Sequence, residues 1–208
     1  MNAVDFDLYL VTDRNQTGGR DLLWVLEQAL DGGVKAVQLR EKDLPGKDFF
    51  LLAEKTCKLC QTYRAALFIN DRVDVALAVD AEGVQLSMAS LPIVTARTLL
   101  GPQKIIGVST HVLQEAREAE QNGADFVLFG PVYYTASKAA YGDPQGLAAL
   151  KTIVDNVSLP VYAIGGITPE NAVSTKKIGV RGVALISAIV SAESPKKATE
   201  QMLRELRS

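Results

Sequence analysis

The chain is organised around an apolar run, Phe126-Val127-Leu128-Phe129, and the segment directly after it, Gly130-Pro131-Val132-Tyr133-Tyr134-Thr135-Ala136-Ser137-Lys138. The apolar run predicts a buried strand, so the second segment is expected to be a loop at the carboxyl end of that strand. This loop carries two hydroxyls and an ammonium, from Thr135, Ser137 and Lys138. Such a combination suits a phosphate, which needs several donors and neutralisation of its charge. In isolation, a solvated surface loop would be the ordinary interpretation.

The same order of apolar run, polar break and helical segment recurs along the chain. Seven further apolar runs cover residues 6–12, 34–39, 66–69, 83–86, 104–108, 159–164 and 182–186. Segments with helical spacing of apolar residues follow at 21–30, 47–63, 73–79, 92–100, 113–122, 147–156, from 168 onward, and at 195–206. In the segment that starts at Thr168, its hydroxyl is expected to cap the helix and Pro169 to take the first helical position.

Because the apolar runs are continuous and do not alternate with polar residues, they predict a parallel sheet buried on both faces. Eight strand-helix units in 208 residues predict an α/β fold, a single (β/α)8 TIM barrel with one domain over residues 1–208. A doubly wound open sheet is the alternative. It is disfavoured because neither G-x-G-x-x-G nor G-x-x-x-x-G-K-[ST] follows any of the runs.

Composition excludes several classes of protein. The net charge is -2, with 48% hydrophobic and 22% charged residues, so neither a disordered chain nor a basic nucleic-acid-binding surface is indicated. The apolar runs are much shorter than a membrane span, and the first residues lack the basic and apolar regions of a secretory signal. We therefore expect a cytoplasmic protein without nucleic acid or membrane partners.

Two cysteines, Cys57 and Cys60, form a C-x-x-C pattern inside the helical segment 47–63. A zinc site would need more ligands, but the chain has no other cysteine and its one histidine is His111. A redox pair is expected at the amino end of a helix, where the thiol pKa is lowered, and this pair lies near the carboxyl end. Both thiols are therefore predicted to be structural.

In a barrel the carboxyl ends of all strands open onto one face, where barrel enzymes have their active sites. Two groups of residues suited to anions are expected at this face. The group suited to a diphosphate contains Arg40, Lys42, Asn70 and Lys138, with Gln38 and Ser109 at neighbouring strand ends. The group suited to a monophosphate contains Thr135, Ser137, Gly166 and Ser187, with Ile186 beside them.

Asp71 lies within the diphosphate group and is predicted to bind Mg²⁺, because this ion is held by one or two carboxylates together with phosphate oxygens. A salt bridge to Arg72 or Arg40 is the alternative for Asp71. For Arg40 and Lys42 the alternative is a solvated helix start. His111 follows a strand end and could act as an acid or base, or could pack or cap a helix, and both interpretations stay open.

Together and in order, these segments resemble the thiamine phosphate synthase (thiamine-phosphate pyrophosphorylase) family and its thiazole tautomerase relatives over nearly the whole chain. The motifs are LYLVTD (8–13), VQLREK (37–42), INDRVD (69–74), GVSTH (107–111), GPVYYTASK (130–138), AIGGI (163–167) and ISA (186–188). The resemblance implies that the chain joins 4-amino-2-methyl-5-(diphosphooxymethyl)pyrimidine to a thiazole phosphate. The products would be thiamine phosphate and diphosphate, with Mg²⁺ as cofactor.

The resemblance also implies a role for each candidate residue. Those that would hold the pyrimidine diphosphate are Gln38, Arg40, Lys42, Asn70, Ser109 and Lys138, and Asp71 would bind Mg²⁺. Those that would hold the thiazole phosphate are Thr135, Ser137, Gly166, Ile186 and Ser187. The residues expected to be catalytic are Arg40, Lys42, Lys138 and Ser109. The cations among them, with Mg²⁺, would stabilise the departing diphosphate while a pyrimidine cation forms.

Ser90 departs from the family pattern. After the fourth strand the family usually reads close to V-H-L-G-Q-E-D, whereas residues 84–90 here read VQLSMAS, so Ser90 stands where a second Mg²⁺ carboxylate is usual. Because a hydroxyl is a weaker ligand for this ion, a thiazole tautomerase-like isomerase and a non-catalytic thiamine-phosphate binding protein are the alternatives. The tautomerase relatives commonly have a catalytic histidine where this chain has Pro131, which favours the synthase. The expected partners are the two small-molecule substrates, and a homo-oligomer is possible.

Overall fold

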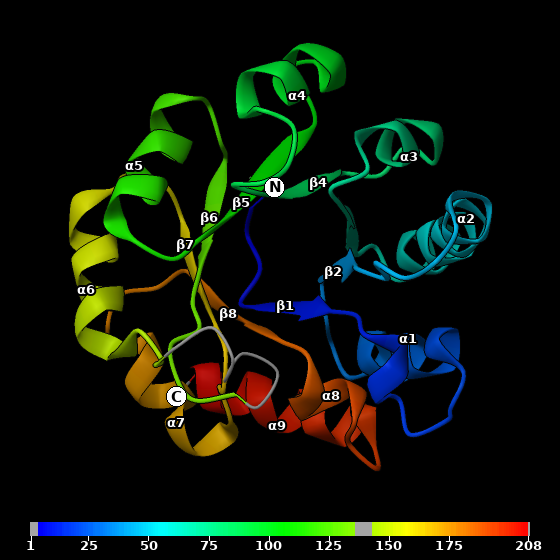
Figure 1. The fold of residues 1–208 in the computed structure, drawn as a ribbon. Coiled ribbons are helices and arrows are strands. Elements are labelled where there is room, and N and C mark those ends of the chain that lie inside the picture. Colours follow the sequence, from blue (N-terminus) through cyan, green and yellow to red (C-terminus); the bar gives the residue numbers. More distant parts are fainter. Residues whose placement is uncertain (1–3, 136–142, 208) are drawn as a thin grey trace.

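The computed structural model describes residues 4–135 and 143–207. Within these ranges eight parallel strands close into a barrel in sequence order, and β8 pairs with β1 (Figure 1). The strands are β1 (Leu8–Val11), β2 (Ala36–Leu39), β3 (Ala66–Asn70), β4 (Gly83–Ser87), β5 (Ile105–Thr110), β6 (Phe126–Phe129), β7 (Val161–Ile164) and β8 (Gly182–Leu185). The predicted (β/α)8 barrel is confirmed, whereas the extent of the domain, residues 1–208, stays a prediction.

Helices surround the ring of strands (Figure 1). They are α1 (Leu22–Asp31), α2 (Gly46–Thr62), α3 (Val73–Ala78), α4 (Ile93–Leu100), α5 (Leu113–Gln121), α6 (Gly146–Asn156), α7 (Pro169–Lys176), α8 (Ser187–Val190) and α9 (Pro195–Arg207). At the start of α7, Thr168 and Asn171 form a reciprocal capping box with Pro169 in the first turn, which confirms the predicted cap. The short α8 and the 3-10 helix η1 (Arg14–Gln16) were not predicted, because a segment of three or four residues is too short to display a helical repeat of apolar residues.

Aromatic rings fill the interior of the barrel. Phe6 stacks on Tyr162 with ring centroids 4.6 Å apart, and Phe126 lies 5.4 Å from Tyr162 and 5.8 Å from Tyr9. Phe6 precedes β1, so the segment before this strand closes the amino end of the barrel. Because every second residue of a strand faces the interior, these rings share the barrel interior with smaller side chains from the strands, among them Val11, Ala36 and Leu128.

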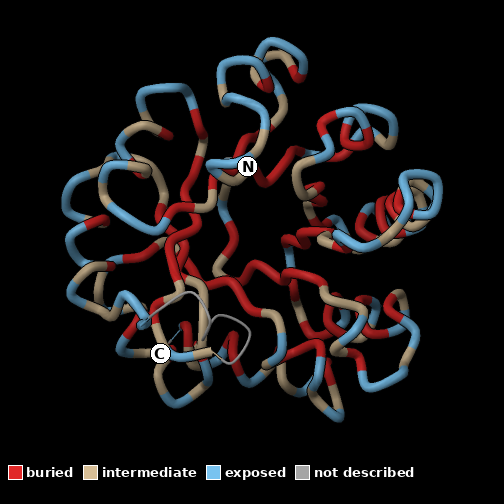
Figure 2. Tube along the Cα trace, in the orientation of Figure 1, coloured by how far each residue is buried: buried red, intermediate tan, exposed pale blue. Residues whose placement is uncertain are grey.

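The other strand positions face the helices and form the outer layer of the core. Figure 2 shows that buried residues follow the strands and the inner sides of the helices. Cys57 and Cys60 of α2 lie in this layer, as the structural interpretation expects. Burial raises the pKa of both thiols, and that of Cys60 to about 12. Neither thiol is therefore activated for redox chemistry.

The last helix completes the outer ring. The amphipathic α9 packs against α1 and α7, and so joins the two ends of the chain on one side of the barrel. Met202, Leu203 and Leu206 form its buried face. In the described part of the chain, every helix is too short or too polar to cross a membrane.

Candidate active site

Polar side chains at the carboxyl ends of β2 to β5 continue the interior rows of the barrel. Because side chains alternate along a strand, the interior positions lead to Gln38 on β2, Asn70 on β3, Gln85 on β4 and Ser109 on β5. The strand register places Asn70 directly beside Gln85. Four neighbouring strands therefore present amides and a hydroxyl at one side of the barrel mouth.

Hydrogen bonds join these polar groups in a chain. Gln38 Nε2 donates to Tyr9 Oη at 3.3 Å, Tyr9 Oη donates to Gln85 Oε1 at 3.4 Å, and Gln85 Nε2 donates to Ser109 Oγ at 3.1 Å. Tyr9, Gln38 and Gln85 are buried, whereas Ser109 is half-buried at the mouth. The series of hydrogen bonds therefore runs from Gln38, at the last interior position of β2, to the half-buried Ser109 at the mouth.

Gln38 and Ser109 could be predicted from the sequence, whereas Tyr9 and Gln85 were not. The signal that could have found them is a polar group at an interior position of an otherwise apolar strand. Gly107 is part of the same arrangement, because a Cβ atom there would lie 2.5 Å from Gln85 Oε1 and 2.2 Å from Phe126 Cζ. Because Gly107 of β5 has no side chain, the Gln85 side chain fits beside this strand.

Asp71 follows β3 in the left-handed backbone region, with a φ of 59°, which few residues other than glycine, Asn and Asp adopt. Its Oδ2 accepts a hydrogen bond from Asn70 Nδ2 at 3.0 Å, and its Oδ1 accepts one from Ser90 Oγ. Ser90 Oγ in turn accepts a hydrogen bond from the backbone N–H of Ser87 at 2.7 Å. Residue 90, which the resemblance aligns with a second Mg²⁺ carboxylate, is therefore in contact with Asp71.

The alternative of a salt bridge for Asp71 is not found. Arg72 turns instead to Asp74, with Nη2 2.6 Å from Oδ2, and this pair holds the pKa of the Asp74 carboxyl below its ordinary value. Among residues 4–135 and 143–207, no ion pair joins Asp71 to Arg72 or Arg40. The negative charge of Asp71 is therefore compensated only by neutral donors in that part of the chain.

Arg40 is half-buried and Lys42 is exposed where β2 runs into its loop. Between them Glu41 is buried, and its carboxylate accepts hydrogen bonds from Thr12 Oγ1 at 2.6 Å and from the backbone N–H of Arg14 at 3.0 Å. Thr12 Oγ1 also accepts the backbone N–H of Arg40 at 2.9 Å, which fixes the base of the Arg40 side chain. Burial raises the pKa of Glu41. Neither Arg40 nor Lys42 forms an ion pair with another described residue, so both cations are available to an anion.

The loop after β6 is attached to the end of β7. The backbone N–H of Tyr133 donates to the Gly165 carbonyl at 3.0 Å. Gly166 adopts a φ of 64°, and a Cβ atom there would lie 2.4 Å from the Tyr134 carbonyl oxygen, so both the conformation and the close approach require glycine. This attachment holds the first part of the loop, up to Thr135, against the strand end that carries Gly166.

The remaining residues of the predicted monophosphate group lie at or near the same side of the mouth. Ile186 lies between β8 and α8, and Ser187 is the exposed first residue of α8. The first N–H groups of a helix have no acceptor within the helix, so this position suits an anion. Thr135 is half-buried at the end of the described part of the loop, and Ser137 and Lys138 lie outside the described residues.

His111 is tied to the loop after β6. Its Nδ1 lies 2.6 Å from the Gly130 carbonyl oxygen, and because a carbonyl only accepts, Nδ1 is the protonated nitrogen. The backbone N–H of His111 donates to Glu115 Oε2 at 2.6 Å, at the start of α5. These contacts fix the orientation of the exposed ring and leave its Nε2 without a hydrogen-bond partner among the described residues, so both interpretations of His111 stay open.

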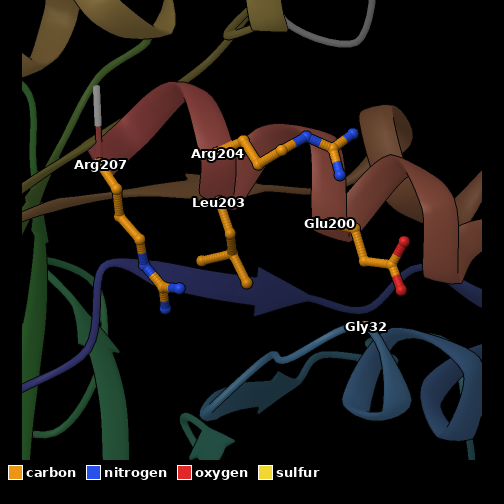
Figure 3. Close-up of a pocket in the computed structure, with 5 residues that line it drawn as sticks. All are labelled: Gly32, Glu200, Leu203, Arg204 and Arg207. Carbon is orange, nitrogen blue, oxygen red and sulfur yellow. The ribbon is translucent and has the colours of Figure 1, made fainter.

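A cavity of about 430 Å³ lies far from these residues (Figure 3). It is lined by Gly32, Glu200, Leu203, Arg204 and Arg207. Gly32 precedes β2, and Arg207 Nε lies 3.9 Å from Asp7, which precedes β1, so this cavity is at the amino ends of the strands. Barrel enzymes have their active sites at the carboxyl ends of the strands, so this cavity is not the candidate site.

The closed barrel defines the class, a (β/α)8 barrel, and cations, amides and hydroxyls lie at the carboxyl ends of its strands, where barrel enzymes have their active sites. Comparisons with known proteins give the family. A family profile described as "Thiamine monophosphate synthase" matches residues 8–189. The chain belongs to this family, and the resemblance found in the sequence is confirmed.

Individual relatives agree over the full length. A protein of Clostridium acetobutylicum named thiamine-phosphate synthase is 47% identical over 204 residues, which cover 97% of this chain and 95% of the relative. A protein of the same name from Desulfitobacterium hafniense is 45% identical over 201 residues, 97% of each chain. The solved structure of a thiamine phosphate pyrophosphorylase from Pyrococcus furiosus has a TM-score of 0.90 and 40% identity, and covers 99% of this chain and 97% of its own.

Proposed function

We propose that the protein is a thiamine phosphate synthase. It joins 4-amino-2-methyl-5-(diphosphooxymethyl)pyrimidine to a thiazole phosphate, and releases diphosphate as thiamine phosphate forms. The observation that carries this proposal is the gathering of Gln38, Arg40, Asn70, Asp71 and Ser109 at neighbouring strand ends, in a chain of the thiamine monophosphate synthase family. The names of the relatives support the same activity.

The diphosphate is held on the side of the mouth formed by β2 to β5. Arg40 and Lys42 supply two cations that form no ion pair with a described carboxylate, and Lys138 supplies a third cation. Asn70 and Ser109 donate hydrogen bonds to the phosphate oxygens. Charge-assisted hydrogen bonds of this kind are about twice as strong as those between neutral groups, so they suit a ligand with several negative charges.

Asp71 is the residue that would hold Mg²⁺. In the described ranges no group of three or more His, Cys, Asp or Glu side chains could hold a metal ion, so the protein offers this ion one carboxylate with the Ser90 hydroxyl beside it. This donor set fits Mg²⁺, because the ion keeps waters and takes most of its other ligands from substrate phosphates. When bound, Mg²⁺ adds positive charge beside the phosphate oxygens.

The chain contributes charge and positioning and forms no covalent bond to the substrate. As the bond between the pyrimidine methylene and the diphosphate oxygen breaks, the electron pair leaves with the diphosphate, and the ring amino group stabilises the methylene cation. The thiazole nitrogen then donates its electron pair to that carbon. Arg40, Lys42 and Lys138 stabilise the charge on the leaving group, and Ser109 donates a hydrogen bond to it.

The thiazole phosphate is held on the opposite side of the mouth, by the ends of β7 and β8 and the loop after β6. Thr135 and Ser137 provide hydroxyls, and Gly166, Ile186 and Ser187 provide backbone N–H groups. The attachment of the loop to the end of β7 supports this grouping. With the two phosphate groups on opposite sides, the thiazole nitrogen and the pyrimidine methylene meet over the centre of the barrel.

Ser90 is the observation that favours a second candidate, a thiazole tautomerase-like isomerase, because that reaction needs no metal. Diphosphate release is the test. With both substrates and Mg²⁺, a synthase releases diphosphate, and omission of either substrate stops the release. If the thiazole compound rearranges alone, the isomerase is correct, and if both compounds bind without turnover, the protein only binds thiamine phosphate precursors. A cytoplasmic location and a homo-oligomer stay predictions.

A further inference from the structure

The Tyr9 hydroxyl is buried and joins two buried amides, Gln38 and Gln85, and Gln85 in turn contacts Ser109 at the mouth. The ring of Tyr9 lies in the interior aromatic cluster, fully buried, with Phe68 and Phe126 at centroid distances of 5.4 Å and 5.8 Å. Its Oη lies 3.3 Å from Gln38 Nε2 and 3.4 Å from Gln85 Oε1. The ring is held by packing on several sides, so the hydroxyl is a fixed point for both amides.

The directions of the hydrogen bonds depend on one another. A tyrosine hydroxyl has one proton, so if it accepts from the Gln38 amide nitrogen it donates to the Gln85 amide oxygen. Gln85 then has only its amide nitrogen to offer Ser109 Oγ, which it reaches at 3.1 Å. Burial raises the pKa of Tyr9 well above its ordinary value, so the hydroxyl keeps this proton.

This order leaves one group unused at each end. Gln38 Oε1 remains as an acceptor, and the Ser109 hydroxyl proton remains as a donor. If every hydrogen bond in this series ran in the opposite direction, the Gln38 amide nitrogen would remain as a donor and Ser109 Oγ as an acceptor. The groups left free at Gln38 and at Ser109 therefore change together. The first order matches the substrate of the proposed function, which has an amino group on its pyrimidine ring and acceptor oxygens on its diphosphate.

We propose that Tyr9 and Gln85 are positioning residues that set the hydrogen-bond polarity of the site, and that they make it select a 4-amino pyrimidine over a 4-oxo pyrimidine. Gln38 accepts the amino group, and the 4-oxo ring presents an oxygen to the same acceptor. A buried acceptor that meets another acceptor loses its partner, and sites built on hydrogen bonds reject such analogues strongly. This inference rests on the proposed function.

The test compares binding of the 4-amino and 4-oxo pyrimidine diphosphates by calorimetry, with Mg²⁺ and without the thiazole phosphate. In the wild type the 4-amino compound should bind at least about 100-fold more tightly. Tyr9→Phe removes the hydroxyl and frees the Gln38 amide to rotate, so this ratio should fall about tenfold or more. Gln85→Met leaves Tyr9 without its acceptor, so Tyr9 can donate to Gln38 instead, and the ratio should fall similarly.

Tyr162→Phe is the matched control. Tyr162 is another buried tyrosine of the same aromatic cluster, but its hydroxyl donates to the Phe6 carbonyl at 2.9 Å, at the other end of the barrel. Tyr9→Phe and Tyr162→Phe should lower the thermal midpoint by a similar few degrees, roughly as expected for one lost hydrogen bond. Only Tyr9→Phe should change the ratio of affinities.

The outcomes separate the inference from the proposed function. If the wild type prefers the 4-amino compound and both Tyr9→Phe and Gln85→Met keep that preference, the polarity inference is overturned while the proposed function stands. If Tyr9→Phe is poorly folded, the result for Gln85→Met decides in the same way. If the wild type binds neither pyrimidine diphosphate, the proposed function and the inference both fail.

Discussion

Ser90→Asp is the substitution that the geometry around Asp71 makes most informative. Ser90 Oγ donates a hydrogen bond to Asp71 Oδ1, so an aspartate at position 90 would place a second carboxylate beside the first. It could still accept the backbone N–H of Ser87, which Ser90 Oγ now accepts at 2.7 Å. The change therefore adds one negative charge at the point where Mg²⁺ is expected.

Two unit charges about 4 Å apart repel by about 1 kcal/mol in water and about 4 kcal/mol at an effective dielectric constant of about 20. Asp71 and Ser90 are both half-buried, so the repulsion in Ser90→Asp should lie between these limits. Without Mg²⁺ the free energy of unfolding at pH 7 should fall by about 1 to 3 kcal/mol. With Mg²⁺ the same charge attracts the ion, and its half-saturating concentration should fall at least about tenfold, or about 1.4 kcal/mol.

Ser90→Asn is the matched control, because an asparagine side chain has nearly the same shape as an aspartate but no charge. Its amide can donate a hydrogen bond to the Asp71 carboxylate and accept one from the backbone N–H of Ser87. Urea unfolding with and without Mg²⁺, and calorimetric titration of Mg²⁺, measure both effects without activity. The stability difference between Ser90→Asp and Ser90→Asn should shrink as the pH falls toward about 4, because a proton shared by two adjacent carboxyls removes their repulsion. Equal Mg²⁺ affinity and equal stability of the two variants would refute a metal site at Asp71.

Three further predictions concern other parts of the chain. Arg40→Ala and Lys138→Ala should each lower turnover by about 10² or more in a diphosphate release assay, with little change in the unfolding midpoint. Lys47 is exposed, and Lys47→Ala should leave the turnover unchanged. Wild-type rates in Arg40→Ala and Lys138→Ala would show that these cations belong to an ordinary solvated surface. Because burial raises the Glu41 pKa, stability from its protonation is fully present below its ordinary pKa of 4.5 and is lost as the pH rises through the raised value. The unfolding free energy of the wild type relative to Glu41→Gln should therefore fall above about pH 4.5, and a constant difference from pH 4 to 8 would contradict this. Cys60, with its pKa raised to about 12, should resist thiol reagents at pH 8 until the protein is unfolded in urea, and rapid modification of the native protein would show that it is exposed.

The barrel could be predicted because a parallel strand buried on both faces leaves an unmistakable pattern. The run at 126–129 has no polar residue, and the structure buries each of its four side chains. Once eight such runs are accepted, the convergence of their carboxyl ends follows from closure of the barrel. Gln38 and Ser109 could therefore be placed at the mouth from their positions alone.

The contacts between strands could not be predicted in the same way. Tyr9 and Gln85 lie 76 positions apart in the chain, and their contact depends on the register of the barrel, which a pattern of apolar residues does not reveal. The same holds for Ser90 and Asp71, since the reach of residue 90 depends on the turn after β4. The sequence could show that the family carboxylate is replaced, but only the fold shows that its replacement still contacts Asp71.

Phosphorus NMR of the complete reaction tests the proposed synthase at its products. With the protein, Mg²⁺ and both substrates, diphosphate and thiamine phosphate should appear in equal amounts, and omission of either substrate should abolish both signals. Asp71→Asn should keep the unfolding midpoint within a few degrees and lose most of this turnover, because it removes the carboxylate that we propose as the Mg²⁺ ligand. Diphosphate without thiamine phosphate, or a thiazole compound that changes when no pyrimidine diphosphate is present, would contradict the synthase.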